Sequence, residues 1–327
     1  MVFLFRDKSI INIFFLVILS IGVHLHFFMG APTLVANSND GIFSIFLNTY
    51  FTKFSATALF IFYHGIVITQ AIRLNLVLNE LKMFQNNTYT TAMAYVLLSA
   101  VLTQWSGISS ALIANYLVIW IFIKLSRLYN HPTPKTLLFN TGLIVGIAII
   151  CYHPTAILIG VVLFALAVVR PFFLAEWIIL LMGILLPYYF LISWFFLSNQ
   201  TSLFNAYLPY LQWNFPFVHW DLPLIFRFAI LFIQLLTGLY FWQLSNKRMV
   251  IQIRKNWGVM IVMLLILLPI PFIFLHAGIE SAFLSLVPLA AFAANAFSNP
   301  RRLLFPNLLF WLAIMIIIYN NWMFIKN

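Results

Sequence analysis

Charged side chains are scarce in this chain of 327 residues, where they make up 7% of the sequence against 64% hydrophobic residues. A soluble domain carries roughly a quarter charged residues, because its surface has to interact with water. So few charges exclude a water-soluble globular protein of this length. The composition therefore predicts a protein that is embedded in a membrane.

Cysteine is nearly absent too, since Cys151 is the one cysteine in the sequence. A single cysteine excludes an internal disulfide and a metal site built from several cysteines. We expect Cys151 to be a small apolar core residue, which is the usual place of a free cysteine. The chain also lacks an HExxH motif. His24 and His26 are two residues apart, so on a helix they would point to nearly opposite sides, and no metal site is predicted there.

Long apolar runs are what the chain does contain. A hydrocarbon core of about 30 Å needs roughly 20 apolar residues in a helix, whereas a transmembrane strand needs about ten alternating ones. The first run is longer than the roughly 7–15 apolar residues of a signal peptide, so we expect it to be retained. We predict an all-α polytopic bundle, in a single membrane domain over residues 1–327, with about eleven spanning helices near residues 9–29, 55–72, 90–105, 108–123, 136–151, 154–169, 173–197, 222–244, 258–275, 279–297 and 304–324.

The basic residues follow a regular pattern along these runs, because most of them fall at every second connection. Cytoplasmic loops carry an excess of Lys and Arg, so the pattern predicts an N-terminus inside and a C-terminus outside. It also accounts for the net charge of +11 by topology and attraction to anionic lipid, without a nucleic-acid partner. Fourteen of the 17 Lys and Arg residues follow it: Arg6, Lys8, Arg73, Lys82, Lys124, Arg127, Lys135, Arg170, Lys247, Arg248, Arg254, Lys255, Arg301 and Arg302.

With this topology, the chemically unusual residues gather on the outer side of the membrane. The acids predicted there are Asp40, Asp221 and Glu280, and the histidines are His24, His26, His153, His219 and His276. Arg227 lies a turn or two inside the eighth apolar run. A charge within a spanning helix is costly and marks a functional site by default, although an arginine at this depth could also snorkel to the headgroups.

Two polar stretches on that side interrupt the apolar runs. The first, residues 30–54, contains Asp40 and continues into an amphipathic piece over residues 42–51 that we expect to lie along the membrane surface. The second, residues 199–221, is rich in aromatic residues, which are Tyr207, Tyr210, Trp213 and Trp220. Such rings are typical of the membrane interface and would also suit stacking against a sugar or an isoprenoid.

Two further polar features indicate structural roles. Arg170-Pro171 is followed by Glu176-Trp177 at the start of the seventh run. Proline suits a first helical turn and a carboxylate near a helix N-terminus is favoured by the dipole, so we interpret this segment as a cytoplasmic anchor. His64 falls in the middle of the second run, where we expect a hydrogen bond between helices.

The sequence resembles an uncharacterised family of bacterial integral-membrane proteins. The resemblance lies in the short basic start, the turn Asn39-Asp40-Gly41, the pattern RPF-x3-EW at residues 170–177 and PYY at residues 187–189. It implies a location in the bacterial cytoplasmic membrane and no particular activity.

The layout also resembles the membrane module of GT-C-type glycosyltransferases, which have an acid in the first outer loop and an outer surface helix. That resemblance implies a sugar donor linked to a polyprenyl phosphate. Asp40 matches the first-loop acid, but the usual paired DxD or ExD motif is absent, because Ser38 and Asn39 stand beside this single Asp. We also expect no counterpart of that family's large outer C-terminal domain in these 327 residues.

From these features we expect a transferase that acts on the outer face. Asp40 would be the general base that accepts the proton of an acceptor hydroxyl. Arg227 would hold the lipid phosphate, because a guanidinium group contacts phosphate in a bidentate manner. The other candidates are Asp221 and His219, which would position the substrate or a divalent cation, and His153 and Glu280, which would line the cavity.

Three alternatives remain open at this point. A transporter or lipid flippase would need polar residues along a path at the midplane, and His64, Asn115 and Gln234 are too few to trace one. A non-catalytic subunit of an envelope complex would need no outer cluster at all. Asp40 itself could be a structural N-cap of a helix that begins near Ile42, since Asp is a preferred capping residue.

Overall fold

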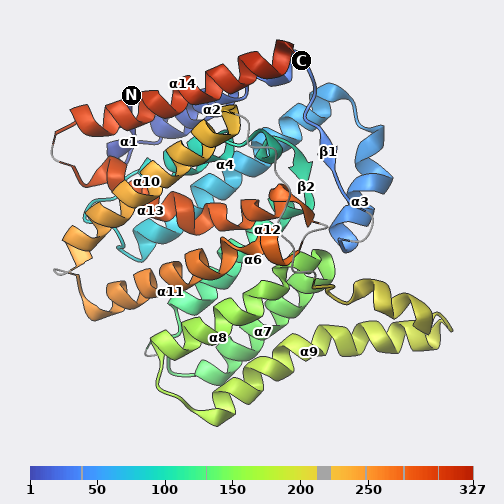
Figure 1. The fold of residues 1–327 in the computed structure, drawn as a ribbon. Coiled ribbons are helices and arrows are strands. Elements are labelled where there is room, and N and C mark those ends of the chain that lie inside the picture. Colours follow the sequence, from blue (N-terminus) through green and yellow to red (C-terminus); the bar gives the residue numbers. More distant parts are fainter. Residues whose placement is uncertain are drawn as a thin grey trace.

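The computed structural model describes residues 1–37, 40–129, 131–211, 222–246, 249–274, 277–300 and 302–326. These residues form a bundle of helices, together with a short ladder in which β1 (Leu34–Val35) and β2 (Ile108–Ser109) pair in parallel (Figure 1). The helices are α1 (Val2–Arg6), α2 (Ile11–Val23), α3 (Ile42–Tyr50), α4 (Ala56–Glu80), α5 (Thr90–Ser99), α6 (Ser110–Ser126), α7 (Pro134–Cys151), α8 (Leu158–Val169), α9 (Leu174–Leu197), α10 (Leu222–Asn246), α11 (Ile251–Leu267), α12 (Ile270–Ile273), α13 (Leu286–Ser298) and α14 (Leu304–Lys326).

Short 3-10 helices are placed between the longer helices. They are η1 (Leu25–Phe28), η2 (Phe51–Lys53), η3 (Thr103–Trp105), η4 (His153–Ile157), η5 (Thr201–Tyr207) and η7 (Ile279–Ser285). The expected surface helix is confirmed as a helix, because α3 and η2 together cover the amphipathic piece of the first polar stretch. Ser44 and Leu47 of α3 are buried, whereas Ile45 and Phe46 are exposed.

Each apolar run expected from the sequence lies on a helix. Within the described residues, six helical segments are long and apolar enough to cross a membrane, and five further apolar helices are shorter, at 10–17 residues. These helices identify the chain as a multi-pass membrane protein. The number of spans and the side on which each terminus lies stay predictions, because length and composition alone define the candidates.

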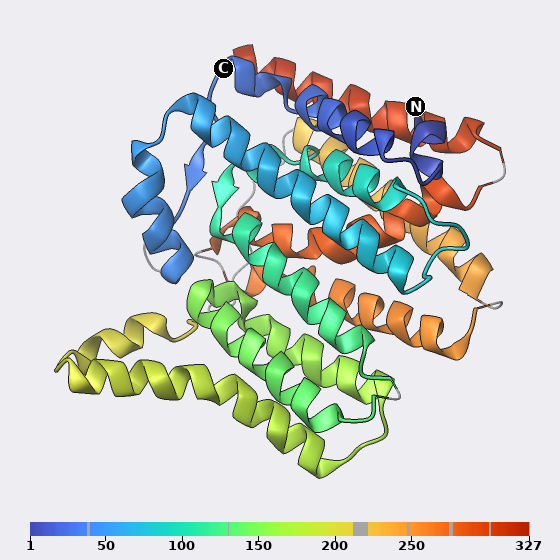
Figure 2. The same cartoon turned by 180° about the vertical axis from the view of Figure 1, so that it is seen from behind.

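Two short helices form the centre of the bundle. All ten residues of α5 are buried, and α13 is buried along its length apart from Ser298. Neither helix carries a charged residue, and a helix that is apolar on every side is expected to be enclosed by others. The two pack against each other, while α2 and α4 also contact α5 (Figure 2).

Helices α7 and α9 pack so closely that glycine is required at their contact. A Cβ atom at Gly142 of α7 would collide with the carbonyl oxygen of Leu180 in α9. A Cβ atom at Gly183 of α9 would collide with the carbonyl oxygen of Phe139 in the same way. Small residues at a helix contact allow backbones to approach this closely in membrane proteins. The contact holds α9 at one edge of the bundle (Figure 1).

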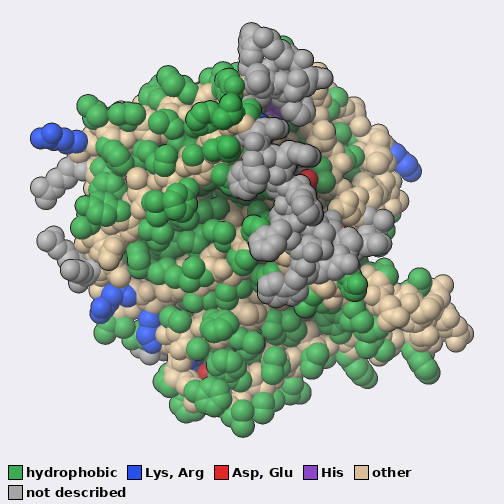
Figure 3. Space-filling model, in the orientation of Figure 1, with side chains coloured by type: hydrophobic (Ala, Val, Ile, Leu, Met, Phe, Trp, Pro, Cys, Tyr) green, Lys and Arg blue, Asp and Glu red, His purple; other side chains and the backbone are tan. Residues whose placement is uncertain are grey.

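The connections between helices gather at two ends of the bundle. We call the left end in Figure 1 the basic end, because the visible Lys and Arg side chains lie mostly on that side (Figure 3). It includes the connections α4–α5, α6–α7 and α8–α9, which carry Lys82, Arg127 and Arg170. We call the other the acidic end, because it carries Asp40 and Glu280 with α3, η4, η5 and η7.

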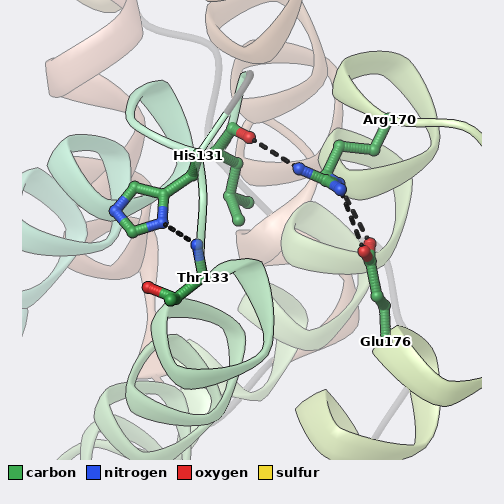
Figure 4. A network of polar contacts seen from close by, with 5 residues as sticks. His131, Thr133, Arg170 and Glu176 are labelled. Carbon is green, nitrogen blue, oxygen red and sulfur yellow. Dashed lines mark hydrogen bonds and ion pairs between the residues drawn. The ribbon is translucent and has the colours of Figure 1, made fainter.

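The segment interpreted as an anchor forms an ion pair at the basic end (Figure 4). The guanidinium group of Arg170 contacts both carboxylate oxygens of Glu176, at 3.1 Å each. Its Nη1 also donates to the carbonyl oxygen of Leu128 at 3.2 Å, which joins this pair to the connection between α6 and α7. A neighbouring cation, Lys255 of α11, donates to the carbonyl oxygen of Val169 at 2.6 Å. These contacts tie the segment to the connection between α6 and α7, and its role as a cytoplasmic anchor stays a prediction.

Candidate functional site

Asp40 is positioned by the contact of the first polar stretch with the end of α7. Gly41 has a φ of 113°, which a residue with a side chain rarely adopts. A Cβ atom at Gly41 would also lie 2.7 Å from the carbonyl oxygen of Cys151. Glycine therefore lets the chain pass directly over the end of α7. Cys151 is itself only partly buried there, which differs from the core position expected for it.

A backbone hydrogen bond fixes Asp40 against the start of η4. The N–H of His153 donates to the carbonyl oxygen of Asp40 at 2.9 Å. The Asp40 side chain is buried, as is that of His153. The N-cap of α3 is Gly41, whose carbonyl oxygen accepts from the N–H of Ile45 at 3.3 Å. Asp40 precedes this position, so its interpretation as the N-cap of the surface helix is wrong.

Asp40 and His153 line one cavity of about 510 Å³ at the acidic end. Another part of the lining comes from η5 and the residues after it, where Asn205 and Tyr210 supply an amide and a phenol. Leu208 and Phe274 add apolar surface. The described lining contains a carboxylate but neither Lys nor Arg, so it suits a neutral, hydroxyl-bearing ligand better than an anion.

Glu280 lies beside this cavity and does not line it. It belongs to η7, and its carboxylate folds back over Gly278, which has a φ of 61°. The phenol of Tyr152, buried between α7 and η4, interacts electrostatically with both acids. Burial raises the pKa of Tyr152 well above its ordinary value, and the negative charges of Asp40 and Glu280 raise the pKa further. The two carboxylates are therefore near the same buried ring.

Arg227 does not join Asp40 in the cavity. It lies near the start of α10, where its Nη1 donates to Thr103 Oγ1 of η3 at 2.8 Å. The side chain is partly buried, and its Nε has no hydrogen-bond partner among the residues that the structure describes. None of the carboxylates among the described residues forms an ion pair with Arg227. Arg227 is thus a partly buried cation whose charge has no counter-charge in the described structure.

Two sequence-predicted site residues, Asp221 and His219, lie outside the described residues, as does His276. Nothing about their position is therefore established. Of the remaining four candidates, the structure brings Asp40 and His153 together, places Glu280 nearby and places Arg227 at η3 instead.

The argument that His24 and His26 face opposite sides of a helix is wrong. Helix α2 ends at Val23, and His24 has φ −112° and ψ 34°, which breaks the helical geometry before η1 begins. The two ring centres are consequently 6.0 Å apart. In the described parts of the chain, no group of three or more His, Cys, Asp and Glu side chains is arranged to hold a metal ion.

Sequence reasoning missed the polar contacts that these histidines make with α4. Tyr63 lies within hydrogen-bond distance of His24, at 3.0 Å from its Nε2, and the Nδ1 of His24 lies 2.9 Å from the carbonyl oxygen of Ser20. The Oγ of Ser20 and the Nδ1 of His64 are 2.8 Å apart, which confirms the interhelical hydrogen bond expected for His64. The available signal in the sequence was the presence of polar residues in two neighbouring apolar runs, with Ser20 and His24 in the first and Tyr63 and His64 in the second.

A second polar group that the sequence did not reveal lies between α4, α5 and α6. The hydroxyl of Tyr95 donates to Gln70 Oε1 at 2.7 Å, and Asn115 Nδ2 donates to the Tyr95 oxygen at 3.0 Å. Asn115 Nδ2 also contacts the carbonyl oxygen of Phe283 at 3.0 Å. All three side chains are fully buried. This group therefore holds helices together inside the bundle.

The chain matches no protein-family model and no curated protein sequence. A function is therefore inferred from the fold and from the chemistry of the residues. What they establish is a multi-pass helical membrane protein with a cavity at its acidic end that is lined by Asp40, His153 and mainly apolar residues.

Proposed function

We propose that this protein is a GT-C-like glycosyltransferase of the bacterial cytoplasmic membrane, which transfers a sugar from a polyprenyl phosphate to an acceptor on the outer face. The observation that carries the proposal is the cavity shared by Asp40 and His153. A buried carboxylate beside an imidazole, an amide and aromatic rings suits binding of a hydroxyl-rich acceptor. The absence of Lys and Arg from its described lining separates this acceptor cavity from any phosphate-binding site.

Asp40 is the general base in this mechanism. The acceptor oxygen forms a bond to the anomeric carbon of the sugar, and its proton passes to the Asp40 carboxylate. The bond between the anomeric carbon and the phosphate oxygen breaks at the same time, and polyprenyl phosphate leaves with that electron pair. His153, which lines the same cavity as Asn205, orients the acceptor. Glu280 adds negative charge near the same site.

Arg227 binds the phosphate of the donor. A cation in a spanning helix is costly unless it is paired, and Thr103 Oγ1 supplies a neutral partner only. An anionic phosphate would provide a counter-charge, which none of the described residues supplies, and accept two parallel hydrogen bonds from the guanidinium group. Because Arg227 lies on α10, the phosphate would be held at η3 while the sugar extends toward the acceptor cavity.

The transporter or flippase alternative has less support from the contacts inside the bundle. Such a protein needs a polar route near the midplane that can open to a substrate. Asn115 is bound to Tyr95 and to the carbonyl oxygen of Phe283, and His64 is bound to Ser20. Two of the three polar residues named for such a path therefore join helices, whereas the buried amide of Gln234 has no hydrogen-bond partner among the described residues. A non-catalytic role in an envelope complex is the outcome that remains if the following experiment fails.

Purification in a mild detergent with native lipids, followed by mass spectrometry of the bound lipids, tests this proposal. The wild-type protein should retain a polyprenyl-phosphate-linked sugar. Arg227→Leu should lose the lipid, whereas Asp40→Asn should keep it, because Asp40 acts on the acceptor. Leucine should also leave membrane insertion intact, since arginine at depth costs a few kcal/mol on insertion scales. Absence of any such lipid from the wild-type protein, or equal retention by Arg227→Leu, contradicts the assigned roles.

A further inference from the structure

A second cavity, a cleft of about 630 Å³, lies at the basic end of the bundle. It is formed where four segments meet: the end of α1, the connection between α4 and α5, the end of α10 and the end of α13. We call it the basic-end cleft. It lies at the other end of the helices from the cavity of Asp40, so it is independent of the proposed function.

Arg6 is held in this cleft by the end of α13. Its Nε donates to the carbonyl oxygen of Phe297 and its Nη2 to that of Pro300, both at 2.9 Å. A cation at a helix C-terminus is favoured by the helix dipole, which helps to fix the guanidinium group. An arginine has five N–H groups, and these bonds use two of them. No hydrogen bond joins the Nη1 amino group to another described residue, so its donors are left for a ligand in the cleft.

The remaining polar side chains of the basic-end cleft are neutral, and each has a group that can donate a hydrogen bond. Gln85 and Asn86 contribute exposed amides, and Ser245 contributes a hydroxyl group. The described lining contains neither Asp nor Glu. Basic residues also stand close to it in the sequence, with Lys82 before Gln85 and Arg302 after Pro300. A site with this charge and these donors favours an anion with several oxygen atoms.

The apolar part of the lining indicates what carries that anion. Phe84 and Phe241 line the cleft, and Leu244, which is 58% exposed, continues it onto the outer surface of α10. A ligand that is polar at one end and apolar at the other would satisfy both parts. Basic pockets between transmembrane helices on the cytoplasmic side are a known form of anionic-lipid site. We propose that the basic-end cleft binds the phosphate group of an anionic phospholipid.

A matched pair of variants tests this proposal. Asn86→Asp places a negative charge in the cleft without a change of side-chain size, and neighbouring Asn87→Asp places the same charge on an exposed residue outside its lining. The purified proteins are compared in nanodiscs of phosphatidylcholine with and without phosphatidylglycerol. Phosphatidylglycerol should raise the Tm of the wild type and of Asn87→Asp, because a ligand of the folded state stabilises it. In Asn86→Asp the rise should fall by at least half.

A second variant and a second probe make the test decisive. Arg6→Gln keeps an amide donor for the carbonyl oxygens of α13 but removes the charge, so it should retain fewer phosphatidylglycerol molecules in native mass spectrometry. Inorganic phosphate is added to the phosphatidylcholine nanodiscs as a separate arm. An equal rise of Tm with inorganic phosphate identifies a free phosphate as the source and still supports a phosphate site. The proposal is overturned if Asn86→Asp, Arg6→Gln and Asn87→Asp respond to phosphatidylglycerol as the wild type does.

Discussion

The backbone N–H of His153 donates to the carbonyl oxygen of Asp40 at 2.9 Å, and this hydrogen bond joins the first polar stretch of the chain to the turn between α7 and α8. It brings two side chains with acid–base chemistry to one cavity. The contact depends on Gly41, because a Cβ atom there would meet the carbonyl oxygen of Cys151. The position of the proposed base is therefore set by backbone packing, before any side-chain contact is considered.

Asp40→Asn should abolish activity without a loss of stability. Asn is nearly isosteric with Asp, and the N-cap of α3 is Gly41, so the substitution removes no cap. A general base loses its proton acceptor on this change, and a decrease of roughly 10²–10⁴-fold in rate is expected. Complementation of a deletion strain, with protein amount measured in the membrane, provides the assay.

Asp7→Asn is the matched control for this prediction, because Asp7 is an exposed acid at the basic end. That variant should complement fully. Full complementation by Asp40→Asn at normal expression would remove the catalytic role and leave the cavity as a binding site.

Gly183→Ala should destabilise the protein by weakening the contact between α7 and α9. The added methyl group collides with the carbonyl oxygen of Phe139, and overpacking of this kind typically costs about 1–3 kcal/mol. Gly160→Ala in α8 is the control, because the nearest atom to its Cβ would be 3.8 Å away. Alanine there should be neutral or stabilising by up to about 1 kcal/mol. Thermal unfolding in detergent compares the two, and equal Tm values would contradict the tight contact.

The ion pair of Arg170 and Glu176 should be strongly coupled. The two side chains are only 18% and 7% exposed, and loss of one partner of a buried pair costs about 3–5 kcal/mol. Glu176→Gln should therefore lower Tm, because Arg170 keeps its charge without a counter-charge. The double variant Arg170→Gln/Glu176→Gln should lose less than the sum of the single variants. Strict additivity in this double-mutant cycle would show that the pair contributes no stability of its own.

The topology predicted from the basic residues can be tested by cysteine labelling. In a Cys151→Ala background, cysteines at Asn37 and Asn205 should react with an impermeant reagent added to intact cells, because both belong to the acidic end. Cysteines at Lys82 and Arg127 should react only after the membrane is opened. Labelling of Lys82 and Asn205 to the same extent from outside would contradict the assignment of sides.

Some properties of this protein follow from its sequence alone. The low charge and the length of the apolar runs are sufficient to predict a helical membrane protein, because the hydrocarbon core sets the length and polarity of a spanning helix. Each expected run lies on a helix for that reason. Proline in a first helical turn and Glu176 near a helix N-terminus likewise indicated a structural segment, and Arg170 and Glu176, which are close in sequence, form an ion pair there.

The tertiary structure alone decided which distant residues meet. Hydropathy describes where a helix runs but not the direction in which it faces a neighbour, so the pairing of Asp40 with His153 and the separate place of Arg227 were beyond a local pattern. The same holds for Gly183, whose contact with α7 depends on how close two backbones approach. His24 and His26 show a second reason: α2 ends at Val23, directly before them, so the two side chains do not follow helical geometry, and His24 lies against Tyr63 of α4.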